Sequence, residues 1–319
     1  AKDADVNIEA CSALANLAVS AQVRQVIARS GAVESIAHAM LAFSDDEEVM
    51  SEASRALVCL AIGSPESKES IASPDVLDAI NRANKRQSEG NQMLEMSCAL
   101  LASLAVGRSL CNQIVGSGSV DTVIKALGPS SDEKLREAAC LAFRNLACEL
   151  GDSDQLLQKG AINGIVSSMG KHGNNVSIQI NSCCSFWNLA YKTEREPGTI
   201  VGSEGIKNIV KAMQSHLESG ELLELACGAL WSLVDDSVDR KKDVVGSGAI
   251  DAVACAVVMH PGRVSTLEKA FGVLSNVSLE RPLAEAIVNA QGVSILVEAM
   301  RNNSSSIPML EVGCMALRN

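Results

Sequence analysis

Apolar residues recur along this chain at helical spacing, and one segment returns at a nearly constant interval. Each copy of the segment is a run of small and aliphatic residues with a polar residue near its end. We call this polar position the index position. It is held by Asn16, Cys59, Ser103, Asn145, Asn188, Ser232, Asn276 and Asn319. Successive index positions lie 42 to 44 residues apart, and a fixed period of this length predicts stacked helical repeats.

Each period predicts three helices. The first is short and is expected to end at glycine, which permits the left-handed turn that stops a helix; it is predicted at residues 25–31, 112–118, 155–160, 242–248 and 284–292. A second helix follows, with apolar residues three and four apart, and then a polar loop. The third helix carries the index position. In the second repeat the sequence Ser73-Pro74-Asp75 stands where the others have glycine.

The third helix has two different faces on a wheel of 100° per residue. Positions five and two before the index, and one and two after it, cluster within ~120° and are predicted to form the core. The index position and the position four before it point the other way. The latter is often small, as in Ser12, Ala99, Cys184, Gly228 and Gly272. Stacked repeats are therefore expected to form a continuous lane of polar and small residues.

Composition narrows the class of partner. Aromatic residues make up 2% of the chain and hydrophobic residues 47%, so the predicted core consists of alanine, leucine, valine and isoleucine in closely packed helices. The net charge of −11 argues against nucleic acid and anionic membranes as main partners, since both require a basic surface. No apolar run approaches the roughly 18 residues of a membrane span, so direct membrane insertion is not expected. A protein or peptide partner is expected instead.

Six of the eleven cysteines occupy one repeat position, five residues before the index. They are Cys11, Cys98, Cys140, Cys183, Cys227 and Cys314. Stacked helices lie about 8–10 Å apart, while disulfide partners need Cα atoms closer than about 7 Å. We therefore predict small buried thiols in a reducing compartment, which favours a cytoplasmic location. No C-x-x-C pair is present, and neither a metal site nor a cofactor is expected.

The period, the Gly-Ala-Ile or Gly-Ala-Val entry to the second helix and the AL-x-N-LA close of the third resemble the armadillo repeat. The resemblance implies an all-α, right-handed α-solenoid of three-helix repeats over residues 1–319. It has six full repeats and partial repeats at both ends, and we expect it to be a fragment of a longer chain. HEAT repeats are the near alternative, but they have two helices and lack both the glycine entry and the asparagine.

In armadillo proteins the third helices line a concave groove whose asparagines hold the backbone of an extended peptide. The resemblance places Asn16, Asn145, Asn188, Asn276 and Asn319 at these positions. Cys59, Ser103 and Ser232 interrupt the series. Importin-α, an armadillo protein, also carries tryptophan four residues before each groove asparagine. None stands there in this chain, which argues against a nuclear-import receptor.

Three residues directly before index positions are candidates for partner selection. Trp187 and Trp231 are the two tryptophans of the chain, and Arg144 holds the same position one repeat earlier. Aromatic and arginine side chains dominate interface hot spots, but these side chains could equally pack against the neighbouring third helix. The predicted binding groove contains Asn16, Ser103, Arg144, Asn145, Trp187, Asn188, Trp231, Ser232 and Asn276.

Two further columns carry charge or possible ligands. Eight before the index stand Glu95, Glu137, Glu224, Glu268 and Glu311. They suit the positive end of a helix dipole, or alternatively an acidic groove edge that selects a basic segment. Sixteen before the index stand His172, His216 and His260. A helix spacing of ~10 Å cannot bring them onto one metal ion, so chance or a solvated edge contact is the expected explanation.

No nucleophile–base pair, phosphate loop or paired-carboxylate site is evident, so the chain is not expected to be an enzyme. The favoured function is a protein–protein interaction module that binds an extended or helical partner segment in the groove. One alternative is a structural scaffold in a cytoskeletal or ciliary assembly, which would place the protein there. Another is a regulatory arm of a multidomain signalling enzyme.

Overall fold

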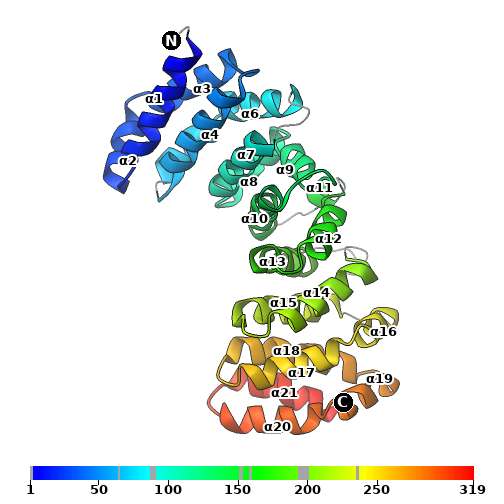
Figure 1. The fold of residues 1–319 in the computed structure, drawn as a ribbon. Helices are drawn as coiled ribbons and strands as arrows, with labels where there is room; N and C mark the ends of the chain where they lie inside the picture. Colours follow the sequence, from blue (N-terminus) through cyan, green and yellow to red (C-terminus); the bar gives the residue numbers. More distant parts are fainter. Residues whose placement is uncertain are drawn as a thin grey trace. The chain divides into compact units, whose positions relative to one another are not determined.

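The computed structural model describes residues 3–63, 65–86, 91–150, 154–157, 160–192, 201–234 and 237–319. Within these ranges the regular structure is α-helical throughout, and Figure 1 shows the helices following one another in the predicted order. The chain divides into two compact units, Ala1–Gly164 and Ile165–Asn319, which are described separately as unit 1 and unit 2.

Unit 1 contains the first four third helices of the predicted repeats. These are α1 (Ala4–Leu17), α4 (Glu47–Ala61), α7 (Asn91–Leu104) and α10 (Glu133–Glu149). The first helices are α2 (Ala21–Arg29), α5 (Pro65–Ile71), α8 (Arg108–Gly116) and α11 (Asp154–Leu157). The second helices are α3 (Ala32–Ala42), α6 (Pro74–Arg86) and α9 (Val120–Ala126).

Unit 2 repeats the same order. Its third helices are α13 (Val176–Lys192), α15 (Gly220–Leu233), α18 (Val264–Ser278) and α21 (Ile307–Arg318). Its first helices are α16 (Val238–Gly246) and α19 (Arg281–Asn289), and its second helices are α14 (Ser203–Ser215), α17 (Ala249–Met259) and α20 (Gly292–Asn302). The second helix α12 (Ala161–Lys171) spans the boundary between the units.

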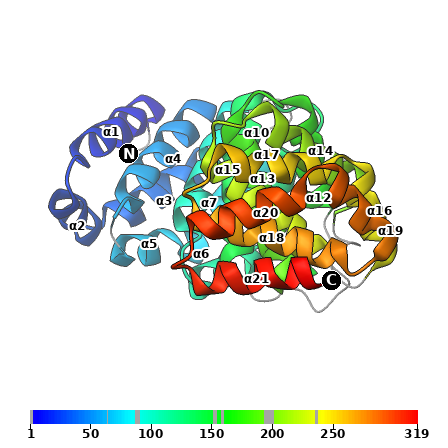
Figure 2. The same cartoon turned by 90° about the horizontal axis from the view of Figure 1, so that it is seen from below.

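The core lies between successive third helices. In unit 1, α4 packs between α1 and α7, and α7 packs on α10; in unit 2, α15 packs between α13 and α18, and α18 packs on α21. Figures 1 and 2 both show α1 beside α4, and α18 beside α21. The predicted core positions are buried in the six inner repeats, where Phe143, Phe186 and Phe271 are fully enclosed, whereas Leu17 in the first repeat and Leu317 in the last are exposed. Apolar burial between the third helices therefore holds the repeats together.

The predicted helix boundaries have clear local causes. Gly31, Gly118, Gly160 and Gly248 adopt the left-handed conformation before the second helix, as expected. In the last repeat the left-handed residue is Gln291, with φ of 57°, and not the predicted Gly292. Gly292 instead begins α20, where an added Cβ would lie 2.6 Å from Ile287 Cγ2. Space, rather than backbone conformation, requires glycine at that position.

The polar loops supply caps for the third helices. Asp46 Oδ1 accepts hydrogen bonds from the backbone N–H groups of Glu48 and Val49. Asp132, Asn175 and Ser219 cap α10, α13 and α15 in the same way. The second repeat needs no glycine, because α5 ends at Ile71 and α6 begins at Pro74, a residue that suits the first position of a helix.

The cysteine column is buried as predicted, except for Cys314 in the last third helix, and all eleven cysteines are free thiols. Burial raises the pKa of Cys11 to about 11 and that of Cys227 to about 12. Burial also raises the pKa of Cys98 and of Cys183 far above the ordinary value. Such thiols stay protonated at neutral pH and are poor nucleophiles.

The described residues contain no cluster of three or more histidine, cysteine or carboxylate side chains arranged to hold a metal ion. No single described helix is long and apolar enough to cross a membrane, although α19 and α20, bent by 71°, pass that test when joined.

Candidate partner-binding face of the third helices

Index asparagines connect neighbouring repeats. Three of them, Asn145, Asn276 and Asn319, donate a side-chain N–H to a backbone carbonyl in, or directly after, the preceding third helix. The bonds join Asn145 Nδ2 to Ala102 O at 2.9 Å, Asn276 Nδ2 to Val234 O at 2.8 Å and Asn319 Nδ2 to Ser275 O at 3.3 Å. We call this set the index ladder. These amide groups therefore already stabilise the stack before any partner is bound.

The other index residues differ in their contacts. Asn188 donates to the Cys184 carbonyl of its own helix at 2.9 Å, and Ser103 donates to the Leu100 carbonyl at 2.7 Å. Asn16 is exposed at the end of α1, and Ser232 is half-buried on α15. All of them remain at least partly accessible to solvent.

The candidate residues fall into two sets. Asn16, Ser103, Arg144 and Asn145 belong to unit 1, whereas Trp187, Asn188, Trp231, Ser232 and Asn276 belong to unit 2. In unit 2 the structure brings the two tryptophans onto neighbouring third helices, α13 and α15, as predicted. The predicted alignment of Arg144 with them joins the two units and stays a prediction.

Both tryptophans pack onto a glycine of the next third helix. A Cβ added to Gly228 would lie 2.9 Å from Trp187 Cδ2, and one added to Gly272 would lie 2.3 Å from Trp231 Cδ2. Gly228 and Gly272 are buried and the two tryptophans are half-buried. The indole rings therefore fill the predicted lane of small residues at these two places. Each ring packs between repeats while part of it faces solvent.

An ion-pair cluster adjoins Trp187. Lys269 Nζ lies 4.9 Å from the centroid of the Trp187 ring and 2.9 Å from Glu224 Oε1. Arg263 Nη2 and Ser265 Oγ donate to the other carboxylate oxygen, Glu224 Oε2, at 3.0 and 2.8 Å. Glu224 lies on α15, whereas its three donors lie on or just before α18. The cluster thus joins two repeats of unit 2 through charge as well as packing.

The cluster sets the protonation of Glu224. Burial alone would raise its pKa, but the hydrogen bonds donated by Lys269, Ser265 and Arg263 outweigh burial. The result is a pKa lowered from 4.5 to about 2. The carboxylate is therefore ionised throughout the physiological range, and the folded state binds its proton more weakly than the unfolded chain does.

This shift predicts acid sensitivity. The Glu224 contribution is present above the unfolded pKa of about 4.5 and is lost as the pH falls toward 2, because the unfolded state takes up the proton first. We expect a contribution of about 2 kcal/mol, after a discount for solvent that reaches the partly exposed carboxylate. Glu224→Gln should remove that part of the pH dependence, as measured by urea unfolding between pH 6 and pH 2.

Glu221→Gln is a matched control on the same helix, because Glu221 is exposed. It should leave the pH profile near that of the wild type. Identical profiles for the Glu224→Gln and Glu221→Gln proteins would contradict the assigned role of the cluster.

The glutamates of this column, Glu224 included, do not occupy the first helical turn. Each is the fifth residue of its helix, as the starts of α7, α10, α15, α18 and α21 show. The dipole effect falls off within the first turn, so it explains this column poorly. Glu224 shows a different use of the position, as the acceptor for basic side chains from the next repeat.

The histidine column takes part in a second set of bonds between repeats. His216 Nε2 lies 2.7 Å from the Gly173 carbonyl, and His260 Nε2 lies 2.7 Å from the Leu217 carbonyl. Because a carbonyl only accepts, each Nε2 carries the donated hydrogen. Asn303 occupies the equivalent position in the next repeat and donates to the Pro261 carbonyl at 2.9 Å. We call His216, His260 and Asn303 the loop-edge ladder; its histidines were recognised from their spacing in the sequence, whereas Asn303 was not.

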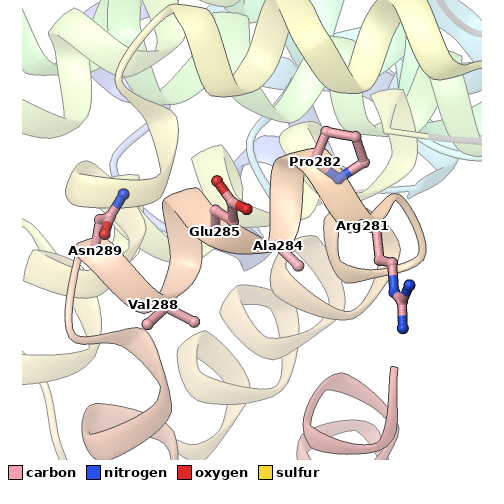
Figure 3. A pocket seen from close by; sticks show the side chains of 6 residues that line it. All are labelled: Arg281, Pro282, Ala284, Glu285, Val288 and Asn289. Carbon is pink, nitrogen blue, oxygen red and sulfur yellow. The ribbon is translucent and has the colours of Figure 1, made fainter.

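Among the described residues, three surface hollows lie on the last repeat, and one of them includes the index residue Asn319. One is lined by Arg281, Pro282, Ala284, Glu285, Val288 and Asn289, all from α19. Figure 3 shows these side chains projecting to different sides of a single helix. They do not converge on a common point, so this hollow lacks the converging polar groups of a small-molecule site.

Comparison with known proteins gives structural matches only. No family model matches the chain, and no curated protein matches it. A structure described in work on cadherin and β-catenin aligns with a TM-score of 0.81 and 16% identity, covering 99% of this chain and 60% of that one. An engineered protein aligns with a TM-score of 0.76 and 22% identity, covering 96% and 72%.

A designed armadillo repeat protein aligns with a TM-score of 0.64 and 14% identity, covering 76% of this chain and 98% of its own. These identities are low, so the likeness concerns the fold. This chain spans three fifths of the structure from the cadherin and β-catenin work.

Proposed function

Because the chain has the armadillo-repeat fold, we propose that it is a protein-binding module that holds a partner segment against the exposed face of its third helices. The observation that carries this proposal is the accessibility of the index positions. Asn145, for example, is half-buried between the fully buried Phe143 and Leu146. Most repeats thus present a polar side chain beside buried core residues of the same helix, an arrangement suited to holding main-chain groups of a partner.

The proposed contact residues in unit 1 are Asn16, Ser103, Arg144 and Asn145. Those in unit 2 are Trp187, Asn188, Trp231, Ser232 and Asn276. Side-chain amides and hydroxyls on this face would bond the partner backbone. The solvent-facing parts of the two indole rings and the half-buried Arg144 would select its side chains. A rigid backing favours this role, because each indole is held against glycine and loses little freedom on binding.

The charge of the chain and the chemistry of its thiols suggest the class of partner and the compartment. The net charge of −11 favours a partner with basic residues over nucleic acid. Buried, protonated thiols fit a reducing cytoplasmic compartment. We assign the chain no catalytic step, because the function rests on a surface rather than on a cleft with converging reactive groups.

A groove-blocking variant tests the proposal. Ser103→Arg/Ser232→Arg places one long side chain on the third-helix face of each unit. Ser109→Arg/Ser305→Arg adds the same charge at exposed positions on α8 and in the loop before α21. Cellular proteins captured by the immobilised wild-type chain are identified by mass spectrometry. We expect the groove-blocking variant to lose them and the control to retain them, once circular dichroism shows equal helicity. Loss in the control alone would refute the proposed face.

A further inference from the structure

The residue three positions after the index is a large exposed apolar side chain in several repeats of both units. In unit 1 it is Val19, 79% exposed, Ile62, 53% exposed, and Val106, 50% exposed. In unit 2 the same position holds Tyr191, 77% exposed, and Leu279, 55% exposed. Single exposed apolar residues are common, but recurrence at one repeat position produces a row. We call Val19, Ile62 and Val106 the apolar rim of unit 1.

The apolar rim lies beside the index residues at the C-terminal ends of α1, α4 and α7. Ile62 directly follows α4, and Val19 and Val106 each lie two residues beyond their helices. Since these third helices pack in order against one another, their ends present the rim side chains along one edge of unit 1. The rim therefore offers successive apolar contacts to a partner that crosses the third helices.

Toward the N-terminal ends of α1 and α4, the face that carries the index residues is acidic. Asp5, Glu9 and Glu48 are exposed, and Glu52 forms a 2.5 Å ion pair with Arg55. These carboxylates stand seven or eleven residues before an index position, which places them within ~20° of it around the helix. Four carboxylates with one arginine leave a net negative charge there. The face thus combines an apolar edge with an acidic edge.

We propose that unit 1 docks an amphipathic α-helix of a partner protein, with apolar residues on one side and lysine or arginine on the other. This inference rests on the proposed function and names the class of its partner. Val19 follows Glu9, and Ile62 follows Glu52, by ten residues, a helical rise of ~15 Å, and Asp5 and Glu48 stand about one helical turn farther away. A helix about 10–12 Å wide with long basic side chains reaches both edges, whereas a single extended strand meets only one.

The spacing between successive rim residues also matches the repeat of an amphipathic α-helix. Packed helices lie about 8–10 Å apart, and seven residues of an α-helix rise about 10.5 Å. One apolar residue per heptad of the partner therefore meets one rim residue per repeat. Contact with the three rim residues takes about two to three heptads.

The test uses a synthetic 21-residue peptide of three heptads, with leucine on one face and lysine on the opposite face. Its partner peptide carries glutamate at every lysine position. Binding to the full chain is measured by fluorescence anisotropy. We expect saturable binding of the lysine peptide that weakens as salt is raised, and none of the glutamate peptide. No saturable binding of the lysine peptide, or equal binding of both peptides, would overturn the proposal.

Two variants locate the contact. Ile62→Ser/Val106→Ser removes two rim side chains, and Val26→Ser/Val258→Ser removes two valines of α2 and α17 that are at least as exposed. We expect the dissociation constant to rise at least tenfold in the first variant and to stay within twofold in the second. Because all four positions are exposed, folding should be preserved in both. Equal binding by both variants would rule out the rim as the docking edge.

The result separates the two proposals. If the lysine peptide does not bind but Ser103→Arg/Ser232→Arg still loses captured partners, the partner class is wrong and the binding face stands. If the groove-blocking variant loses nothing, the proposed function itself fails.

Discussion

Gly272→Leu is expected to lower the free energy of unfolding by about 3–4 kcal/mol, since overpacking a close contact usually costs 1–3 kcal/mol and leucine adds four carbons. A Cβ on Gly272 would lie 2.3 and 2.4 Å from two carbons of the Trp231 ring. Real Cβ atoms do not approach other atoms so closely, so the ring or the helix must move. The ring is half-buried between repeats, and its displacement would separate α15 from α18. Denaturant unfolding followed by circular dichroism measures the loss.

Two further variants isolate the contact between Trp231 and Gly272. Gly246→Leu changes a helical glycine with no neighbour within 4 Å of its added Cβ, and it should leave stability unchanged or slightly higher. Trp231→Ala/Gly272→Leu lets leucine occupy space vacated by the ring. It should therefore be more stable than the sum of the two single changes predicts. Strict additivity, or equal stability of the Gly272→Leu and Gly246→Leu proteins, would show that the two residues do not restrain one another.

Arg136→Met is expected to cost about 3 kcal/mol, because it removes charged hydrogen bonds worth about 1.5–3 kcal/mol each while keeping most of the side-chain volume. Arg136 is fully buried. Its Nε donates to the Ser131 carbonyl at 3.1 Å and its Nη2 donates to the Gly128 carbonyl at 2.5 Å. Both acceptors belong to the loop that joins α9 to α10. Burial lowers the pKa of the guanidinium, yet arginine stays charged at neutral pH.

The next repeat suggests a substitution of Arg136 that should retain part of the stability lost in Arg136→Met. Gln179 stands at the equivalent position, nine before the index, and donates to the carbonyls of Met169 and His172. Arg136→Gln should therefore lose less stability than Arg136→Met. Lys134→Met changes an exposed cation two residues away and should stay within about 0.5 kcal/mol of the wild type. If Arg136→Met is as stable as Lys134→Met, the loop does not depend on these hydrogen bonds.

The helices and their core faces could be predicted from the sequence because both follow from local periodicity. The 42 to 44 residue period located the third helices, and residues two before and one after the index are buried in the six inner repeats, as in Leu57 and Leu60. The prediction that the first helix ends at a left-handed glycine was correct at Gly31, Gly118, Gly160 and Gly248. It was wrong in the last repeat, where Gln291 takes that conformation. Local pattern cannot show that Gly292 is required for space beside Ile287.

Contacts between repeats were harder to foresee. In the sequence, tryptophan stands one residue before the index and glycine stands four residues before the index of the next repeat. We interpreted the two as separate features. Their combination, Trp187 with Gly228 and Trp231 with Gly272, was a signal that could have identified the packing. The roles of Lys269 and Glu224 depend on side-chain directions across α15 and α18, which periodicity along one helix does not determine.

The two hydrogen-bonded ladders affect how unit 2 deforms. The index ladder and the loop-edge ladder connect the same third-helix repeats at positions sixteen residues apart in the chain. A single row of bonds would act as a hinge, whereas two separated rows fix the angle between neighbouring repeats. Bending unit 2 must stretch one row, at a net cost near 1 kcal/mol per bond, while the apolar contacts between third helices remain closed. Unit 2 is therefore an elastic element with a preferred curvature, and its resistance to bending comes from polar bonds that water can replace and that re-form when the load is removed.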